Sequence, residues 1–283
     1  MSEQAMPHKT KGPLIYRQSI WTRVTHWTWA IALFFLLLSG LQIFNAHPSL
    51  YVGQQSGFEF DNAVLSMYAE APDGEARGYT NLFGNKIDTT GVFGVSGSAE
   101  QPQFRGFPAA LTIPSYQDLA TGRVVHFFFG WVFVTAIFIW FLVSFISGHI
   151  RRDVIPTPSD LKNLPQDVAD HARLRFHHGR SYNVLQKIAY SGVFFVLFPL
   201  IILTGLTMSP GMDAAWPFLL DVFGGRQTAR TIHFSVMVLL VLFFVIHILM
   251  VFAAGPFNEL RSMITGWYRA SPGTPFDPAK GEK

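Results

Sequence analysis

The hydrophobic positions of this chain fall into four long runs that polar segments separate. The runs cover roughly residues 24–44, 124–147, 188–208 and 231–254, and none of them contains Asp, Glu, Lys or Arg. A helix needs about 20 mostly apolar residues to cross about 30 Å of hydrocarbon. The pattern therefore predicts four transmembrane helices. Pro199 interrupts the third run and predicts a kink, where neighbouring groups must satisfy the freed backbone carbonyl.

The polar segments differ strongly in length. Residues 45–121 are rich in Gly, Ser, Asp, Asn and Pro, which predicts a turn-rich, mostly irregular insertion. Its scattered aromatic residues favour an ordered subdomain with a face for a partner. Residues 209–222 are too short to span and should lie along the outer interface. We expect an all-α membrane protein, a single domain over residues 1–283, built as a four-helix bundle with one large periplasmic insertion.

Composition supports this class. Hydrophobic residues make up 49% of the chain and charged residues only 14%, which is too apolar for an ordinary soluble domain. The chain has no cysteine. This excludes haem attachment through C-x-x-C-H, thiolate-held iron–sulfur clusters and disulfides. Residues 1–20 lack the apolar core of a signal peptide, so we expect the first helix to remain as an uncleaved anchor.

The distribution of charge predicts the orientation in the membrane. Lys and Arg gather in residues 1–23, 149–187 and the segment after 254, whereas residues 45–121 carry three basic side chains against eight acidic ones. The positive-inside rule then places both termini in the cytoplasm and residues 45–121 in the periplasm of a bacterial inner membrane. The net charge of +3 resides in these loops, so it does not indicate a nucleic-acid partner.

Four histidines lie inside the apolar runs, and three of them follow an arginine by three residues: Arg23/His26, Arg123/His126 and Arg230/His233, with His247 fourteen residues beyond His233. Fourteen residues correspond to about 21 Å along a helix and return to within about 40° of the same face. Intramembrane histidines are costly unless they are paired or ligated. Helix direction pairs His126 with His233 near the periplasm and His26 with His247 near the cytoplasm.

Neutral imidazole ligates haem iron, and an arginine near the surface can pair with a propionate. We therefore expect two haem b groups held by these pairs, with the three arginines at their edges. The alternative is that each histidine only forms hydrogen bonds between helices. A polar cluster before the third helix is a candidate quinone site, with His178, Tyr182 and Asn183 as its main residues. Its alternative is a solvated basic loop.

The motifs RVTHW, HFFFG, YNVLQK and R-x-x-H with a second His fourteen residues later resemble the prokaryotic cytochrome b561 / nickel–iron hydrogenase b-type cytochrome family. The resemblance covers residues 17–44 and 120–268. It implies a four-helix dihaem cytochrome b that passes electrons between a periplasmic catalytic subunit and membrane quinone, with His26, His126, His233 and His247 as ligands. Asn183 matches an asparagine that helps to place quinone in the formate dehydrogenase relatives. Longer stretches are similar to the branch that serves periplasmic molybdopterin oxidoreductases.

These observations favour an electron-transfer subunit over two other functions. A stand-alone enzyme of the cytochrome b561 type would oxidise superoxide and reduce quinone, but the acidic insertion would repel a superoxide anion. A haem-free membrane anchor would leave the matched histidines unexplained. The enlarged insertion departs from the compact members of the family.

Overall fold

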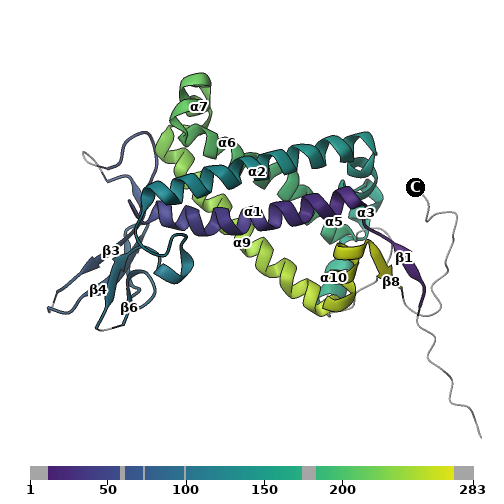
Figure 1. Ribbon diagram of the computed structural model, residues 1–283, viewed down its shortest axis with the longest axis horizontal. Coiled ribbons are helices and arrows are strands. Elements are labelled where there is room, and N and C mark those ends of the chain that lie inside the picture. The colour runs from purple at the N-terminus through teal and green to yellow at the C-terminus, as the bar shows by residue number, and fades with distance from the viewer. Residues whose placement is uncertain (1–11, 58–60, 73, 99, 174–182, 271–283) are drawn as a thin grey trace, which may run out of the picture. The chain divides into compact units, whose positions relative to one another are not determined.

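The computed structural model describes residues 12–57, 61–72, 74–98, 100–173 and 183–270 (Figure 1). Four helical segments are long and apolar enough to cross a membrane: α1 (Ile20–Phe44), α2 (Leu119–Ile146), the segment Val184–Met208, and α9 (Arg226–Ala254). Each begins four or five residues before the predicted run, because a polar first turn extends beyond the apolar stretch. The prediction of four transmembrane helices is confirmed, and the chain is a multi-pass membrane protein.

The third spanning segment has a change of helix type beside its proline. It consists of α5 (Val184–Gly192), a π-helical turn η3 (Val193–Leu197) and α6 (Phe198–Met208). Proline lacks an N–H and its ring collides with the carbonyl four residues earlier in a regular helix. The wider π turn accommodates that carbonyl directly before Pro199.

The described residues divide into two compact units that cut across the long helices. The terminal unit contains residues 1–27, 139–190 and 243–283, and the insertion unit contains residues 28–138 and 191–242. The described residues of the insertion unit form the strands β2 (Ser49–Tyr51), β3 (Ala63–Glu70), β4 (Arg77–Leu82), β5 (Asn85–Asp88), β6 (Gly94–Gly97) and β7 (Pro102–Arg105). It also contains the short helices η1 (Ala109–Leu111), α7 (Pro210–Ala215) and α8 (Phe218–Phe223).

The expectation of an all-α protein is correct for the spanning helices only, because the insertion also contains several β-strands. The order β2-β3-β4-β5 forms one antiparallel sheet, and β6 pairs with β7 in a second. The glycine-rich stretches are the turns of these hairpins. At the β4–β5 turn, Phe83 and Gly84 both have positive φ, at 49° and 81°, which suits the twist of a two-residue hairpin. These strands are short and of mixed polar composition, so their alternation of apolar and polar residues was too brief to predict a strand.

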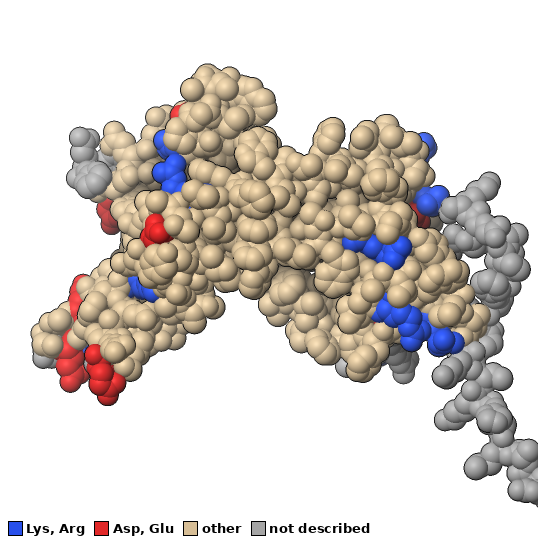
Figure 2. All heavy atoms as spheres, viewed as in Figure 1, with Lys and Arg blue, Asp and Glu red and all other residues tan. Residues whose placement is uncertain are grey.

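A hydrophobic core joins the insertion to the spanning helices within the insertion unit. Phe44 and Leu41 of α1 pack there with Leu50, Met67 and Phe107 of the insertion. The Asn45 side chain donates to the Phe107 carbonyl at 3.0 Å and accepts from the Phe107 N–H at 2.7 Å. The insertion is therefore an ordered subdomain fixed to the end of α1. Figure 2 shows acidic side chains on the part of the surface that the insertion forms.

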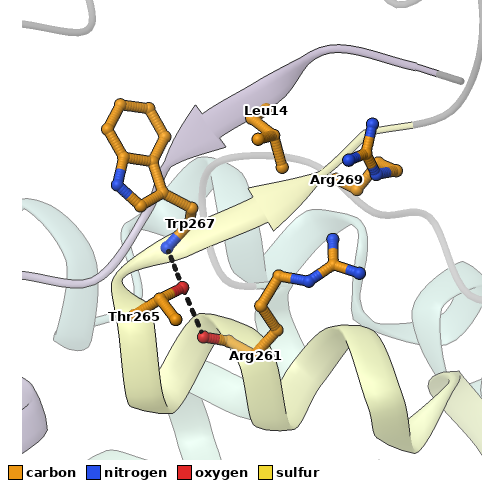
Figure 3. A pocket seen from close by; sticks show the side chains of 5 residues that line it. All are labelled: Leu14, Arg261, Thr265, Trp267 and Arg269. Carbon is orange, nitrogen blue, oxygen red and sulfur yellow. Dashed lines mark hydrogen bonds between the residues drawn. The ribbon is translucent and has the colours of Figure 1, made fainter.

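The terminal unit brings together segments from the two ends of the chain. Strand β1 (Leu14–Tyr16) pairs antiparallel with β8 (Trp267–Arg269) beside α10 (Pro256–Thr265) (Figure 3). The unit also contains the π turn η2 (Ile150–Val154), α3 (Pro158–Lys162) and α4 (Leu164–Ala172). Because β1 precedes α1 and β8 follows α9, this pairing holds both ends of the described chain at one side of the membrane.

Candidate functional site

The insertion unit contains the first of two histidine pairs. His126 on α2 and His233 on α9 have ring centroids 6.4 Å apart, with ring planes inclined by 59°. Both side chains are half-buried in the protein. The structure thus brings together the two residues that the sequence paired by depth.

A serine on α1 sets the protonation of His126. The Ser39 hydroxyl lies 3.1 Å from Nδ1 of His126 and donates its single proton to the Phe35 carbonyl at 2.6 Å. It must therefore accept a hydrogen bond from Nδ1–H. A neutral imidazole that is protonated at Nδ1 has its free lone pair at Nε2, which is the nitrogen available to a metal.

Thr204 on α6 repeats this arrangement for His233. Its hydroxyl lies 3.1 Å from Nδ1 of His233 and donates to the Leu200 carbonyl at 2.6 Å. The same reasoning assigns the free lone pair of His233 to Nε2. Ser39 and Thr204 are both fully buried. Each imidazole therefore enters the pair as a neutral ligand with one nitrogen held by a hydroxyl.

A glycine follows each of these hydroxyl residues and lies against the same ring. A Cβ at Gly40 would come within 3.2 Å of His126, and a Cβ at Gly205 within 3.3 Å of His233. Only glycine lets the ring approach the neighbouring helix so closely. These two contacts of a hydroxyl residue and a glycine with a histidine ring were not predicted from the sequence. The repeated motifs L-S-G-L and L-T-G-L within two apolar runs could have indicated them.

The terminal unit contains the second pair. His26 on α1 and His247 on α9 have ring centroids 6.5 Å apart, with planes inclined by 53°. Phe243, one turn before His247, stacks on its ring at 5.9 Å, and Trp27 contacts His26 edge-on at 5.5 Å. The second predicted pair is therefore also brought together, and its separation is almost the same as that of the first.

The donor set of each pair fits haem. Within the described ranges no group of three or more His, Asp or Glu side chains is placed to hold a metal ion, whereas a structural zinc ion takes four protein ligands. Haem iron needs only axial ligands from the protein. Metal–imidazole bonds of about 2 Å on both sides, plus roughly 1 Å from each nitrogen to its ring centre, separate the centroids by about 6 Å. Both observed separations agree with this value.

The three predicted arginines lie near the pairs but already have protein contacts. Arg23 donates to the Ile264 carbonyl at 2.6 Å and Arg230 donates to the His47 carbonyl at 2.6 Å. Arg123 is exposed, with its guanidinium 5.6 Å from the centre of the Phe127 ring. A guanidinium has five N–H donors, so one such bond leaves others for an anionic group.

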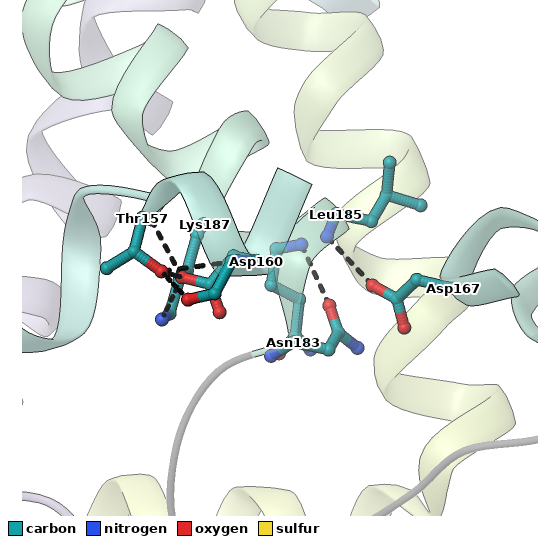
Figure 4. A network of polar contacts seen from close by, with 8 residues as sticks. Thr157, Asp160, Asp167, Asn183, Leu185 and Lys187 are labelled. Atoms are coloured by element: carbon teal, nitrogen blue, oxygen red, sulfur yellow. Dashed lines mark hydrogen bonds and ion pairs between the residues drawn. The ribbon is translucent and has the colours of Figure 1, made fainter. Parts of the chain in front are cut away.

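Polar side chains at the start of α5 form the network of Figure 4. Asn183 accepts from the Gln186 N–H at 2.9 Å, and the Gln186 side chain accepts from the Asn183 N–H at 3.3 Å. This is a reciprocal helix cap. Asn183 thus has a structural role that the sequence analysis did not foresee. His178 and Tyr182, its predicted companions, lie outside the described residues.

An ion pair holds the same helix to the preceding loop. Lys187, which is almost fully buried, donates to Asp160 at 2.8 Å. This bond, together with hydrogen bonds from Thr157, lowers the pKa of Asp160 to about 2. Asp167 accepts from the Leu185 N–H at 2.9 Å. The segment before α5 is therefore built around carboxylates that secure the first turn of the helix.

Four spanning helices with two pairs of intramembrane histidines define a membrane protein of the cytochrome b class. Residues 17–266 match the family model described as prokaryotic cytochrome b561, and the chain belongs to this family. Membership implies haem b binding and confirms the resemblance seen in the sequence motifs. The chain is also 27% identical over 248 residues to the putative protein-methionine-sulfoxide reductase subunit YedZ1 of Azospira oryzae, covering 87% of this chain and 94% of that protein.

Proposed function

We propose that the chain is a dihaem cytochrome b subunit that passes electrons between a periplasmic oxidoreductase and the membrane quinone pool. The observation that carries the proposal is the pairing of histidines from separate helices at centroid separations of 6.4 and 6.5 Å. Two pairs of equal geometry, one in each unit, favour two binding sites over interhelical hydrogen bonds. Bound haem supplies one-electron chemistry at its iron.

Each residue of the two sites has a defined task in this proposal. His126 and His233 hold the outer haem, and His26 and His247 hold the inner one. Ser39 and Thr204 keep the outer imidazoles in the tautomer that ligates through Nε2. Arg123 and Arg230 offer N–H donors to propionates of the outer haem, and Arg23 does so for the inner haem. The apolar core around Phe44 includes Phe234, the residue that follows His233.

Haem stoichiometry tests the proposal directly. We expect two haems per purified chain by the pyridine haemochromogen method. Changing His126 or His233 to Ala should leave one haem, and so should changing His26 or His247. Matched controls are His47→Ala and His149→Ala, which should retain two. One haem in the unmodified chain, or full haem content in all four ligand variants, would overturn the assignment.

We infer that the partner is a periplasmic oxidoreductase with a molybdopterin cofactor, bound through residues 45–121 and 209–229. The name of the Azospira relative supports a reductase partner. For such a partner, electrons run from quinol through this chain. The insertion exposes Phe83 and Phe104, which are 72% and 56% accessible. Aromatic anchors of this kind often dominate the binding energy of a protein interface.

Point substitutions test the docking face without disturbing the core of the insertion. Phe83→Ser with Phe104→Ser should abolish copurification of the partner and substrate-linked haem oxidation, while dithionite still reduces both haems. Leu161→Ser, at an exposed apolar position of α3 outside the proposed docking face, is the control. If no periplasmic protein copurifies and the chain alone reduces quinone with superoxide at a high rate, the stand-alone enzyme is the correct function.

We propose the quinone site beside the inner pair, with Asn183, His178 and Tyr182 as its polar residues. The proposed orientation has both termini in the cytoplasm and the insertion in the periplasm of the inner membrane. The asymmetry of Lys and Arg supports it, and the β1–β8 pairing supports a common side for the two ends. Reporter fusions at residues 45–121 and after residue 270 decide the orientation. An external C-terminus would reverse the depths assigned to both haems.

A further inference from the structure

The surface of the terminal unit has an open pocket that the electron-transfer proposal does not use. Its volume is about 360 Å³, and it is lined by Leu14, Arg261, Thr265, Trp267 and Arg269. Figure 3 shows the two arginines on one flank, with Leu14 and Trp267 along the strands. Two cations beside an apolar wall form a lining suited to an amphipathic anion.

The arginines around this pocket are only partly satisfied by the described residues, since the buried Nε atoms of Arg17 and Arg23 have no hydrogen-bond partner there. Arg17 pairs with Glu259 at 3.4 Å, and Arg23 donates to the Ile264 carbonyl at 2.6 Å. Arg269 gives one N–H to the Gly12 carbonyl at 3.0 Å. In Arg261, the Nη1 atom is buried and has no hydrogen-bond partner in the part of the chain that the structure describes. A buried donor without a partner is costly, so an acceptor beyond the described residues is expected there.

The position of the pocket places that acceptor at the membrane surface. Helix α9 ends at Ala254, and α10 begins two residues later at Pro256. The exposed side chains of α10 are mostly apolar, with Phe257 88%, Leu260 46% and Ile264 58% accessible. An amphipathic helix that directly follows a spanning helix lies in the interface between headgroups and acyl chains. Trp267, 45% accessible, is of the type that anchors at this depth.

We propose that this pocket binds an anionic phospholipid. Its phosphate would accept hydrogen bonds from Arg261 and Arg269, because a guanidinium matches two phosphate oxygens. The acyl chains would lie along Leu14, Trp267 and the apolar face of α10. A soluble phosphate compound would gain nothing from that apolar wall. A zwitterionic lipid would bring a second, positive charge close to the two arginines. This inference is independent of the haem and quinone assignments.

Native mass spectrometry of the full-length chain, purified in detergent and supplied with single lipids, tests the proposal. We expect one phosphatidylglycerol to remain bound under conditions that remove phosphatidylcholine. Arg261→Gln should weaken its retention about fivefold, as expected when a guanidinium close to an anionic headgroup is lost. The matched control is Arg151→Gln, which removes an exposed arginine of the same unit. It should change retention less than twofold.

Further arms separate the outcomes. Arg269 also donates to the Gly12 carbonyl, so Arg269→Gln tests lipid binding only if its melting temperature equals that of the unmodified chain. If the melting temperature differs, the result of Arg261→Gln alone decides. Equal retention of phosphatidylcholine, or unchanged phosphatidylglycerol retention in Arg261→Gln, would overturn the proposal. So would displacement of the lipid by millimolar inorganic phosphate, which would make the site a simple phosphate site. Haem content serves as the folding control, and it should be the same in every variant.

Discussion

The Ser39 hydroxyl lies 3.1 Å from Nδ1 of His126, and because it donates its own proton to Phe35, it acts as an acceptor for the imidazole. An acceptor on Nδ1–H makes a ligating imidazole more electron-rich. In the proposed outer site this stabilises the oxidised iron relative to the reduced iron. Ser39 would therefore lower the reduction potential of one haem only.

Replacing Ser39 with Ala should raise the midpoint potential of the outer haem by about 40 mV. This magnitude assumes a hydrogen bond of about 1 kcal/mol and 59 mV per tenfold change for one electron. A spectroscopic redox titration measures it. Ser39→Thr should restore the original value, and Ser235→Ala, on an exposed part of α9, should leave both potentials unchanged. A shift of both haems, or none, would contradict the assigned role.

Adding one methyl group at Gly40 should remove the outer haem selectively. The new Cβ would approach Cε1 of His126 to 3.2 Å and Nδ1 to 3.5 Å, so the ring must move by a few tenths of an ångström away from its ligating position. Haem content should fall from two to about one per chain. Gly192→Ala is the matched control, because no heavy atom lies within 4 Å of its Cβ position and its backbone is helical. That variant should be neutral or stabilised by up to about 1 kcal/mol. Equal haem loss in both variants would contradict a specific role of Gly40 beside His126.

Substitutions of Asn183 separate its capping role from a role in quinone binding. Asn183→Ala should destabilise the protein by about 1 kcal/mol, because the first turn of α5 loses its cap. Asn183→Asp keeps an acceptor for the Gln186 N–H but removes the amide donor. If quinone binds here, both variants should slow quinol-dependent haem reduction while both haem spectra stay intact. Normal kinetics in Asn183→Asp would leave Asn183 as a cap only and place quinone elsewhere.

The stability of the terminal unit should depend on the ionisation of Asp160. Its pKa is lowered to about 2 in the folded protein from an ordinary value of 3.8. The stabilisation is therefore complete above about pH 3.8 and is lost as the pH falls towards 2. Asp160→Asn should lower the melting temperature at pH 7, and its difference from the unmodified chain should narrow below pH 3.8. Asp170→Asn, in the neighbouring α4, is the control. A difference that does not change with pH would contradict this origin.

The sequence determined the membrane architecture of this protein. The backbone polar groups of four apolar runs without charges can only be satisfied as helices in a bilayer. The last residue of each span therefore agrees closely with the structure, whereas each helix begins four or five residues before the predicted run. The histidine pairs could also be predicted, because a helix has a fixed rise and a fixed rotation per residue. His233 and His247 are fourteen residues apart on one helix, and their partners followed from helix direction alone.

Tertiary structure decided what depends on contacts between distant segments. The strands of the insertion could not be recognised because a short hairpin such as β4–β5 is specified by turn geometry, whereas β3 is held by the packing of Met67 with Phe44 and Phe107. Ser39 and Gly40 contact the His126 ring only because α1 lies against it in the folded protein. The pairing of β1 with β8 joins residues more than 250 positions apart, and local sequence carries no signal for such a contact.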